Sequence, residues 1–516
     1  MSENLPKIFI TGASGFIGQY LLEAIKDHFK IFALARRIPK SNDINGHPNI
    51  TWLQADIGVA ASLTKAIEVI KNSGGCDYVI HLAGYYDFNY DENPEYYHTN
   101  VLGTQNVLEQ VKDLGIKRFI FASSVAACEF PKKGTRLNEK SLADARFAYA
   151  WTKREGEKMV KGYSKLFPCC IVRFAAVFSD WCEYGPFYIF LHTWLTRNWK
   201  SRILGGKGES AITYIHVNCL INLLLSVIKK TDEIDNYDVF IVSPEEPVTH
   251  NTLFKLATKY YYGKSKRPIH IPKFLATLGV YAMDLMGRMI GKRPFERPWM
   301  MQYVDKQLRV DANYTSNKLE WTPTKRYMIE RRLMFMIEHM KSYPYEWQKR
   351  NIKALKFMPL TPNFIIYEAL DISREKIINK FLDEVYDGKN LGKFENYQKL
   401  PRINFNKDTI TVYQFLSVSV RTKDRMSMLA YAREIAKVRS SMNFKKEEVL
   451  SVMDLLSETI HDKLISLPGL YGMEQQIYDE ITLTFQLMND EIEGMFEQIE
   501  IEKTRDFSLP GKSTIP

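Results

Sequence analysis

A tyrosine and a lysine four residues apart, Tyr149 and Lys153, are the side chains of this sequence best suited to proton transfer. They lie in a stretch with a helical pattern, and residues four apart share one face of a helix. A tyrosine with a pKa of about 10 is a poor acid or base near neutrality, so a cation beside it must favour its phenolate. Lys153 is placed to do this. Ser124 lies at the end of an apolar run, 119–125, that is typical of a buried strand, and its hydroxyl would hold a reacting oxygen beside the phenol.

A glycine-rich turn near the start of the chain predicts a phosphate-binding site. The residues Thr11-Gly-Ala-Ser-Gly-Phe-Ile-Gly18 follow an apolar run, 7–10, and precede an amphipathic helix. Gly12 allows a sharp turn, Gly15 lets the backbone approach a pyrophosphate, and Gly18 lets the helix pack closely on the strand. The helix N-terminus then offers free N–H groups and a partial positive charge. Glycines alone are a weak signal, but the order strand, turn and helix strengthens it.

Over about residues 5–345, the chain resembles the extended short-chain dehydrogenase/reductase superfamily, which includes nucleotide-sugar epimerases, dehydratases and 3β-hydroxysteroid dehydrogenases. The resemblance rests on the ordered set of glycine turn, Ser124, Tyr149 and Lys153. It implies that these three side chains are catalytic and that Lys153 also binds the nicotinamide ribose. Short apolar runs alternate with helical patterns from Lys7 to about Arg173, which independently favours an α/β fold with a doubly wound parallel (Rossmann) sheet.

Further motifs extend the resemblance and supply the other predicted contacts. Asp56 matches the acid that binds adenine in the family, Ala83-Gly84 ends a strand beside the cofactor, and Asn100 begins a helix near the catalytic centre. The predicted cofactor-binding residues are Gly12, Ser14, Gly15, Phe16, Ile17, Gly18, Arg36, Arg37, Asp56, Ile57, Leu82, Ala83, Gly84, Asn100, Tyr149 and Lys153. The predicted substrate pocket comprises Tyr85, Tyr86, Ser124 and Tyr149, with Asp87 and Phe88 in the same loop. No metal site is predicted.

The end of the second predicted strand indicates which dinucleotide is bound. The strand Ile31–Ala35 is followed by Arg36 and Arg37, at the place where a fold that prefers NAD carries an acid for the ribose 2′-hydroxyl. A guanidinium group can instead bind a 2′-phosphate with two hydrogen bonds. The sequence therefore predicts NADP, with NAD as the alternative if the two arginines are only solvated.

The reaction is predicted from the cofactor and from the residues near the site. Epimerases and dehydratases of the family usually retain NAD, whereas NADPH suits net reduction. Val125 and Ala126 follow Ser124, where sugar dehydratases carry an Asp-Glu pair. We therefore expect an NADP-dependent oxidoreductase that interconverts a carbonyl and a secondary alcohol. The alternatives are an NAD-dependent nucleotide-sugar epimerase and a redox-sensing regulatory protein that acts through the helical C-terminal tail.

Two apolar segments favour a sizeable, apolar small molecule as the substrate. The segment 181–198 is rich in aromatic residues, and an apolar stretch at 271–283 precedes Arg288, Lys292, Arg293 and Arg297. Contact with a membrane surface would explain the same pattern, as would ordinary core packing. A homodimer is also compatible with the sequence.

Charge and cysteine content restrict the class of protein. The formal net charge is +10, but the basic residues are scattered and no nucleic-acid-binding signature is found, so no nucleic-acid partner is predicted. The six cysteines form no CxxC pair and are typical of free thiols in a reducing compartment. The sequence enters its first strand at once, which leaves no room for a secretory signal. We therefore expect a cytoplasmic location.

Composition along the 516 residues predicts four segments. Residues 1–177 are expected to form the NADP-binding Rossmann core, and 178–345 a substrate lobe interleaved with its last strands. Proline and glycine residues suggest a connector over 346–407. Residues 408–516 are expected to form an all-α domain of unknown role, in which an apolar stripe from Ile477 to Ile499 recurs every three or four residues.

Overall fold

The computed structural model divides into two compact units, Met1–Met358 and Pro359–Pro516, which are described separately. The described residues are 5–38, 44, 46–87, 93–196, 198–291, 293–351, 354, 362–390 and 392–507. Phe88, predicted beside the substrate pocket, and Lys292, predicted in the basic group, lie outside these ranges.

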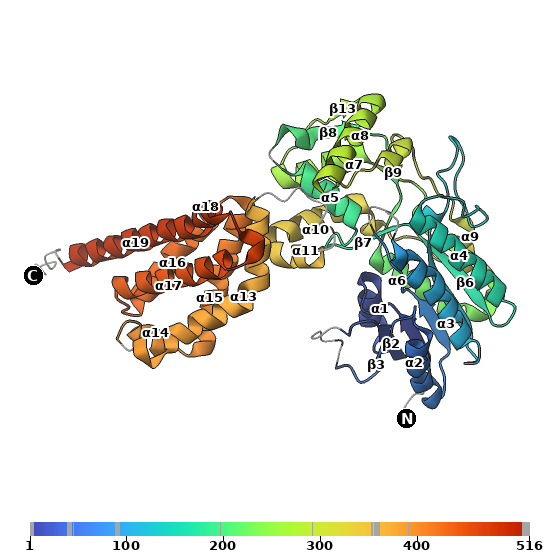
Figure 1. Ribbon diagram of the computed structural model, residues 1–516, viewed down its shortest axis with the longest axis horizontal. Helices are drawn as coiled ribbons and strands as arrows, with labels where there is room; N and C mark the ends of the chain where they lie inside the picture. Colours follow the sequence, from blue (N-terminus) through green and yellow to red (C-terminus); the bar gives the residue numbers. More distant parts are fainter. Residues whose placement is uncertain are drawn as a thin grey trace, which may run out of the picture. The chain divides into compact units, whose positions relative to one another are not determined.

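A seven-stranded parallel sheet forms the centre of the first unit (Figure 1). Its strands, in spatial order, are β11 (Tyr237–Val242), β6 (Cys169–Phe174), β5 (Arg118–Ser124), β4 (Tyr78–His81), β1 (Lys7–Thr11), β2 (Lys30–Ala35) and β3 (Ile50–Gln54). The order reverses between β1 and β4, so the carboxyl ends of these strands diverge and leave a crevice at that edge. The predicted Rossmann fold is confirmed.

Helices cover both faces of this sheet, because successive residues of each strand point to opposite sides. Ile8 and Ile10 pack toward α1 (Phe16–Ile25) and α6 (Val217–Lys229), whereas Phe9 packs toward the other helical layer. That second layer consists of α2 (Ala60–Asn72), α3 (Gly103–Val111) and α4 (Ala148–Tyr163). Strands buried on both faces read as continuous apolar runs, as observed here.

A second part of the first unit has its own aromatic core beside the sheet edge. Its helices are α5 (Gly185–Trp194), α7 (His250–Tyr262), α8 (Lys273–Ile290), α10 (Ile329–Ser342) and α11 (Pro344–Arg350), whereas α9 (Asn313–Leu319) packs against the main sheet through Leu319. Its strands form pairs: β7 (Ala176–Phe178) with β10 (Tyr214–His216), β8 (Ile203–Gly205) with β13 (Ile269–Ile271), and β9 (Ala211–Ile212) with β12 (Val248–Thr249). Since β11 returns to the main sheet after β10, the two parts are interleaved along the chain.

The second unit is helical and has a separate core. Its helices are α13 (Pro362–Tyr386), α14 (Glu395–Lys399), α15 (Arg402–Thr422), α16 (Met426–Ser441), α17 (Lys446–Ile465), α18 (Glu474–Ile477) and α19 (Leu483–Phe507). Ile477, Ile481, Phe485, Met488 and Ile492 are buried in this core. Most of the apolar stripe therefore packs inside the unit.

Much of the stretch 346–407, predicted as a connector, is helical. It contains α13, α14 and the start of α15, and Ile366, Leu370 and Phe381 of α13 belong to the core of the second unit. Pro362 and Pro401 lie at the beginnings of α13 and α15. Proline is tolerated there because its missing N–H has no acceptor within the helix. Pro362 and Pro401 therefore lie where helices begin, whereas the proline content of 346–407 had been interpreted as evidence of a linker.

Two further observations concern the whole described chain. None of its helices combines the length and the apolar character needed to span a bilayer. All six cysteines are free thiols with buried side chains.

Candidate active site

The glycine turn forms a tight passage between β1 and α1 where side chains cannot fit. Gly12 has φ +72°, and a Cβ atom on it would lie 2.7 Å from the backbone nitrogen of Ala83. A Cβ on Gly18 would lie 2.5 Å from the carbonyl oxygen of Gly12. Gly15 is the N-cap of α1, whose first turn carries no acidic residue. The backbone is therefore open to an anion at the positive end of α1, as a pyrophosphate requires.

The loop after β4 is held against this turn by a buried histidine that the sequence analysis did not single out. The Nδ1 atom of His81 lies 2.7 Å from Thr11 Oγ1, and its Nε2 atom lies 3.0 Å from Thr104 Oγ1. Thr11 Oγ1 also accepts a hydrogen bond of 3.2 Å from the backbone N–H of Ala83. Burial, followed by the nearby charge of Lys153, lowers the pKa of His81 to about 3. His81 is thus a neutral positioning residue for the loop that contains Ala83.

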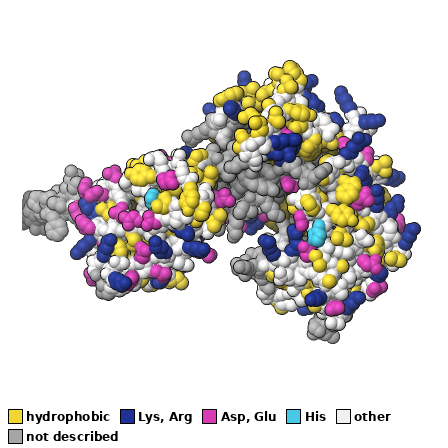
Figure 2. Space-filling model, in the orientation of Figure 1, with side chains coloured by type: hydrophobic (Ala, Val, Ile, Leu, Met, Phe, Trp, Pro, Cys, Tyr) yellow, Lys and Arg dark blue, Asp and Glu magenta, His cyan; other side chains and the backbone are white. Residues whose placement is uncertain are grey.

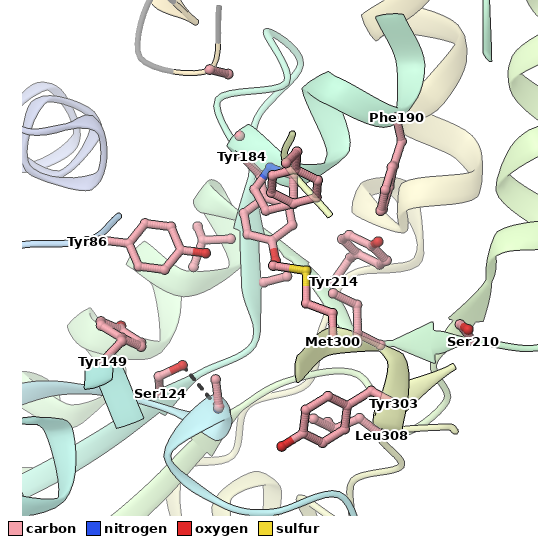
Figure 3. A pocket seen from close by; sticks show the side chains of 18 of the residues that line it. Tyr86, Ser124, Tyr149, Tyr184, Phe190, Ser210, Tyr214, Met300, Tyr303 and Leu308 are labelled. Carbon is pink, nitrogen blue, oxygen red and sulfur yellow. Dashed lines mark hydrogen bonds between the residues drawn. The ribbon is translucent and has the colours of Figure 1, made fainter. Parts of the chain in front are cut away.

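The three predicted catalytic side chains lie together where β5 ends and α4 begins. Ser124 Oγ accepts a hydrogen bond of 3.1 Å from the backbone N–H of Ala126, and Ser124 is also hydrogen-bonded to Tyr149. Lys153 Nζ donates a hydrogen bond of 2.7 Å to the carbonyl oxygen of Ala122 and lies 5.7 Å from the centre of the Tyr149 ring. Figure 3 shows Ser124 and Tyr149 on one wall of the same cavity.

Burial controls the proton affinities of this group. It raises the pKa of Tyr149 well above 10, and the hydrogen bond with Ser124 opposes the rise only partly. Burial also lowers the pKa of Lys153 to about 8, against the attraction of Glu157. The expected lowering of the tyrosine pKa is therefore not observed in the protein alone, because desolvation of the phenolate dominates. At neutral pH, Tyr149 carries its proton and Lys153 is mostly charged.

A buried ion pair fixes α4 to the sheet beneath these residues. Glu157 accepts hydrogen bonds from Arg173 Nε at 2.9 Å, from Arg173 Nη2 at 2.7 Å and from Ser123 Oγ at 2.6 Å. Both charged side chains are buried. Glu157 was not predicted as a site residue, although it lies one turn after Lys153 on the same helix face. The ion pair orients the helix face that carries Tyr149 and Lys153.

Asn100 has a structural role beside the site and is not among the residues that line the cavity. Its Nδ2 atom donates hydrogen bonds of 3.0 Å to the carbonyl oxygen of Tyr85 and to Thr152 Oγ1. Its Oδ1 atom accepts a hydrogen bond of 2.6 Å from the backbone N–H of Tyr85. The side chain thereby joins α4 to the loop after β4. A Cβ on Gly84 in this loop would lie 3.5 Å from Lys153 Nζ, so the loop passes directly beside the ammonium group.

The cavity, of about 1280 Å³, is enclosed by residues of the first unit. The predicted site residues in its wall are Ser14, Gly15, Phe16, Ile17, Leu82, Gly84, Tyr85, Tyr86, Ser124, Tyr149 and Lys153. The ring centres of Tyr86 and Tyr149 are 5.0 Å apart, and Tyr184 lies across the cavity from Tyr149 (Figure 3).

The opposite wall was not assigned residue by residue from the sequence. It is mostly apolar and comes from α5 and its N-cap residue, from β10, from α8 and from the segment before α9. Its members include Tyr184, Phe190, Tyr214, Phe295, Trp299, Met300, Tyr303 and Leu308. Figure 3 shows Phe190 and Tyr303 facing the space on the side away from Tyr149. Aromatic enrichment at 181–198 was the available sequence signal, but it did not show that the segment after α8 contributes as well.

Other predicted residues lie outside the cavity wall, at the β2–β3 end of the sheet edge. Arg36 Nη1 forms an exposed ion pair of 3.0 Å with Glu95, so an acid does lie beside this arginine. Arg37 is exposed. Asp56 Oδ1 accepts a hydrogen bond of 2.9 Å from the backbone N–H of Gly58 and lies 3.4 Å from His98 Nε2. The side chain of Ile57 is buried in the helix–sheet core and therefore presents no surface to a ligand.

Gly12, Gly18 and Ala83 shape the turn from behind the cavity wall, as the close approaches of their backbones show. Among the described residues, no group of three or more His, Cys, Asp or Glu side chains could hold a metal ion.

Comparison with known proteins adds evidence about ancestry. Residues 8–243 match the model of the NAD dependent epimerase/dehydratase family. The chain is 25% identical over 296 residues to N-acetyl-alpha-D-glucosaminyl-diphospho-ditrans,octacis-undecaprenol 4-epimerase of Escherichia coli O157:H7, covering 55% of this chain and 81% of that protein. It is 25% identical over 344 residues to 3beta-hydroxysteroid-dehydrogenase/decarboxylase isoform 1 of Arabidopsis thaliana, covering 61% of this chain and 75% of that protein.

A solved structure supports the fold alone. The crystal structure of UDP-glucose 4-epimerase from Thermotoga maritima, with UDP-glucose, superposes with a TM-score of 0.51 at 20% identity. The match covers 65% of this chain and 99% of that one.

Proposed function

We propose a specific reaction for this chain, whose residues 8–243 belong to the NAD-dependent epimerase/dehydratase family and which is an NAD(P)-dependent enzyme of the extended short-chain type. The proposed reaction is the interconversion of a carbonyl and a secondary alcohol on a sizeable, apolar small molecule, with NADP as cofactor. One observation carries the proposal: Ser124, Tyr149 and Lys153 meet a largely aromatic and aliphatic wall in a single cavity.

The residues at the glycine turn and at Lys153 are suited to binding a dinucleotide. The turn at Gly12 and Gly18 leaves no room for side chains where a pyrophosphate would approach, and Lys153 and Gly84 both line the cavity. When bound, the cofactor supplies the hydride that reduces the carbonyl carbon. Phe16 and Ile17 contribute backbone at the start of α1 and also line the cavity.

Side chains of the protein transfer the proton that the substrate oxygen gains in reduction. In reduction, Ser124 donates a hydrogen bond to the carbonyl oxygen, and Tyr149 transfers its phenolic proton to that oxygen. The raised pKa of Tyr149 keeps this proton in place until negative charge develops on the substrate oxygen. Lys153, charged at neutral pH, then stabilises the phenolate that remains. In oxidation, the same atoms act in reverse.

The choice of an apolar substrate is supported by the wall opposite Tyr149. Among the described residues, Lys153, Lys306 and Arg350 are the lysines and arginines that line the whole cavity, and Lys153 lies beside Tyr149. Arg350 pairs with Glu183 at 3.5 Å and with Glu346 at 2.8 Å. A diphosphate would compete with those carboxylates for Arg350. The name of one relative refers to a sugar diphosphate linked to a polyprenol, and the name of the other refers to a steroid, so each name includes a lipophilic group.

The preference for NADP rests on Arg37. Arg36 is already paired with Glu95, but the pair is exposed, and exposed pairs contribute only about 0–1 kcal/mol. Arg37 lies next to it on the same edge and is exposed. A 2′-phosphate would be bound by Arg37, with Arg36 exchanging Glu95 for the phosphate.

Replacement of the tyrosine tests the proposal. We expect Tyr149→Phe to lower kcat by roughly 10³-fold or more, because the proton donor is lost, while the Kd for NADPH changes less than about twofold. Tyr86→Phe is the matched control, since it removes a hydroxyl from the same wall without removing the donor. Carbonyl compounds of increasing size would be screened by the decrease in NADPH absorbance. Turnover at the unsubstituted level in Tyr149→Phe would refute the assigned role.

A nucleotide-sugar epimerase with tightly bound NAD is the second candidate, favoured by the similarity to the Escherichia coli epimerase. The nucleotide that copurifies with the protein separates the two. Bound NAD⁺ together with measurable affinity for uridine diphosphate would favour the epimerase. Exchangeable NADP(H) without that affinity would favour the oxidoreductase.

A further inference from the structure

Helix α8 exposes an unusually apolar surface. Of its 18 residues, 13 are exposed, and only Val280, Asp284 and Gly287 are buried. The exposed side chains include Phe274, Leu278, Leu285, Met286, Met289 and Ile290, and Met289 is 82% exposed. Figure 2 shows apolar atoms gathered over α8, with basic side chains nearby. Proteins rarely leave a contiguous patch of this kind in water unless it binds something.

The charges around this helix are almost all of one sign. The segment 255–293 contains nine lysines and arginines and a single acid, Asp284. That carboxylate is buried, and it accepts hydrogen bonds from Arg288 Nε at 3.0 Å and Arg293 Nε at 2.7 Å. No acidic side chain of this segment is therefore presented to solvent. A basic rim around an apolar helix face is complementary to an anionic lipid surface.

The other face of the same helix lines the cavity. Leu275, Ala276, Gly279, Val280 and Met283 all contribute to the cavity wall. Leu275 and Met283 are also exposed, so they form a rim between the cavity and the outer apolar surface. The apolar surface is thus continuous from the outside of α8 to the space that faces Tyr149.

We propose that α8 lies in the interface of an anionic lipid bilayer, with its outer face among the upper acyl chains and its basic neighbours against the headgroups. The cavity then receives its apolar substrate directly from the lipid leaflet; this second step rests on the proposed function. An interfacial helix lies along the membrane plane and does not need the length or uniform hydropathy of a spanning helix. The amphipathic pattern of α8 meets that requirement.

Vesicle binding by the full-length protein tests the docking step without reference to catalysis. The protein would be sedimented with vesicles of phosphatidylcholine alone or with added phosphatidylserine. We expect binding to the anionic vesicles that weakens as salt is added. The triple variant Leu278→Ser, Leu285→Ser, Met289→Ser removes apolar area that does not line the cavity, and it should weaken this binding roughly tenfold or more. The control Leu142→Ser, Leu166→Ser, Ile403→Ser removes exposed apolar side chains elsewhere and should bind normally.

A charge variant tests the electrostatic part. Lys264→Gln with Arg267→Gln should weaken binding to anionic vesicles by roughly fivefold for each charge removed and leave binding to neutral vesicles unchanged. Turnover of a water-soluble carbonyl compound should be the same in the triple variant as in the original protein. Turnover of a substrate embedded in vesicles should fall with vesicle binding.

Three outcomes would overturn the docking proposal. The first is that the original protein does not bind anionic vesicles, and the second is that the triple variant binds them equally well. The third is that light scattering shows a dimer for the original protein and a monomer for the triple variant, while neither of the two binds vesicles. The last result would assign the surface to a second copy of the chain. Failure of every carbonyl substrate would refute the proposed function and leave the vesicle result intact. Normal vesicle binding with unchanged turnover of embedded substrate would refute only the delivery step.

Discussion

The buried pair Glu157–Arg173 offers a test of how the catalytic helix is held, through the substitution Glu157→Gln. Glutamine keeps the shape of the side chain but removes the charge that balances Arg173, which is buried in β6. Breaking a buried pair by removing one partner costs about 3–5 kcal/mol. Because glutamine can still accept one hydrogen bond, we expect the lower end, about 3 kcal/mol of unfolding free energy.

The eight tryptophans make this measurement specific to one unit. All of them lie between Trp52 and Trp347, within the first unit, so tryptophan fluorescence in urea follows that unit alone. The double variant Glu157→Met, Arg173→Met removes both charges and should cost less than Glu157→Gln, because no unpaired buried charge remains. A loss below about 1 kcal/mol for Glu157→Gln, or a greater loss for the double variant, would refute this account.

The same substitution should change the pH dependence of catalysis. Burial lowers the pKa of Lys153 to about 8, and Glu157 acts in the opposite direction. Removing the Glu157 charge should therefore lower the pKa of Lys153 further, so that the ammonium is lost at a lower pH. The alkaline limb of kcat/KM should move to lower pH in Glu157→Gln. A limb that stays in place would show that Glu157 has only a structural role.

Three other substitutions follow from the geometry. In Gly18→Ala the new Cβ would lie 2.5 Å from a backbone oxygen, so the Kd for NADPH should rise roughly tenfold or more, whereas Gly162→Ala in α4 meets nothing within 4 Å and should not change it. Arg37→Glu should weaken NADPH binding roughly tenfold or more and leave NADH binding unchanged, as measured by calorimetry; equal effects on both would exclude a 2′-phosphate contact. The pKa of buried His81 is about 3, below its unfolded value near 6.5, so its stabilisation is complete above pH 6.5 and is lost as pH falls toward 3. Urea midpoints should therefore show a loss of about 2 kcal/mol between about pH 7.5 and pH 5, and a smaller loss in His81→Asn.

Short-range patterns allowed the fold and the centre of the candidate site to be predicted. Gly18 is required by the close approach of the Gly12 carbonyl oxygen, six residues earlier, and Tyr149 and Lys153 are related by one helical turn. Continuous apolar runs identified the strands because both faces of a parallel sheet are buried. Each of these relations is local, so a single sequence is sufficient to recognise it.

Long-range relations could not be predicted in this way. Arg36 forms an ion pair with Glu95, which is 59 positions away, and no local pattern predicts that these two residues pair. Arg173 and Glu157 are brought together only when α4 packs on the sheet. The helical character of α13 was also missed, because its proline is at the helix start and its apolar residues are spread around the helix. The pKa of Tyr149 depends on complete burial, which is a property of the whole cavity and not of the Tyr-Lys spacing.

The electrostatics of the candidate site explain how one tyrosine can serve both directions of the proposed reaction. In the protein alone, burial raises the pKa of Tyr149, so the phenol is the stable form and proton donation is favoured. Moving that pKa down by about three units, as deprotonation of an alcohol near neutrality requires, needs about 4 kcal/mol of differential stabilisation. Lys153 alone does not achieve this in the structure, although it lies 5.7 Å from the ring centre. A positive charge brought into the cavity by the oxidised form of the cofactor would add to that of Lys153. Tyr149 would then act as an acid in reduction and as a base in oxidation, with the direction set by the redox state of the bound dinucleotide.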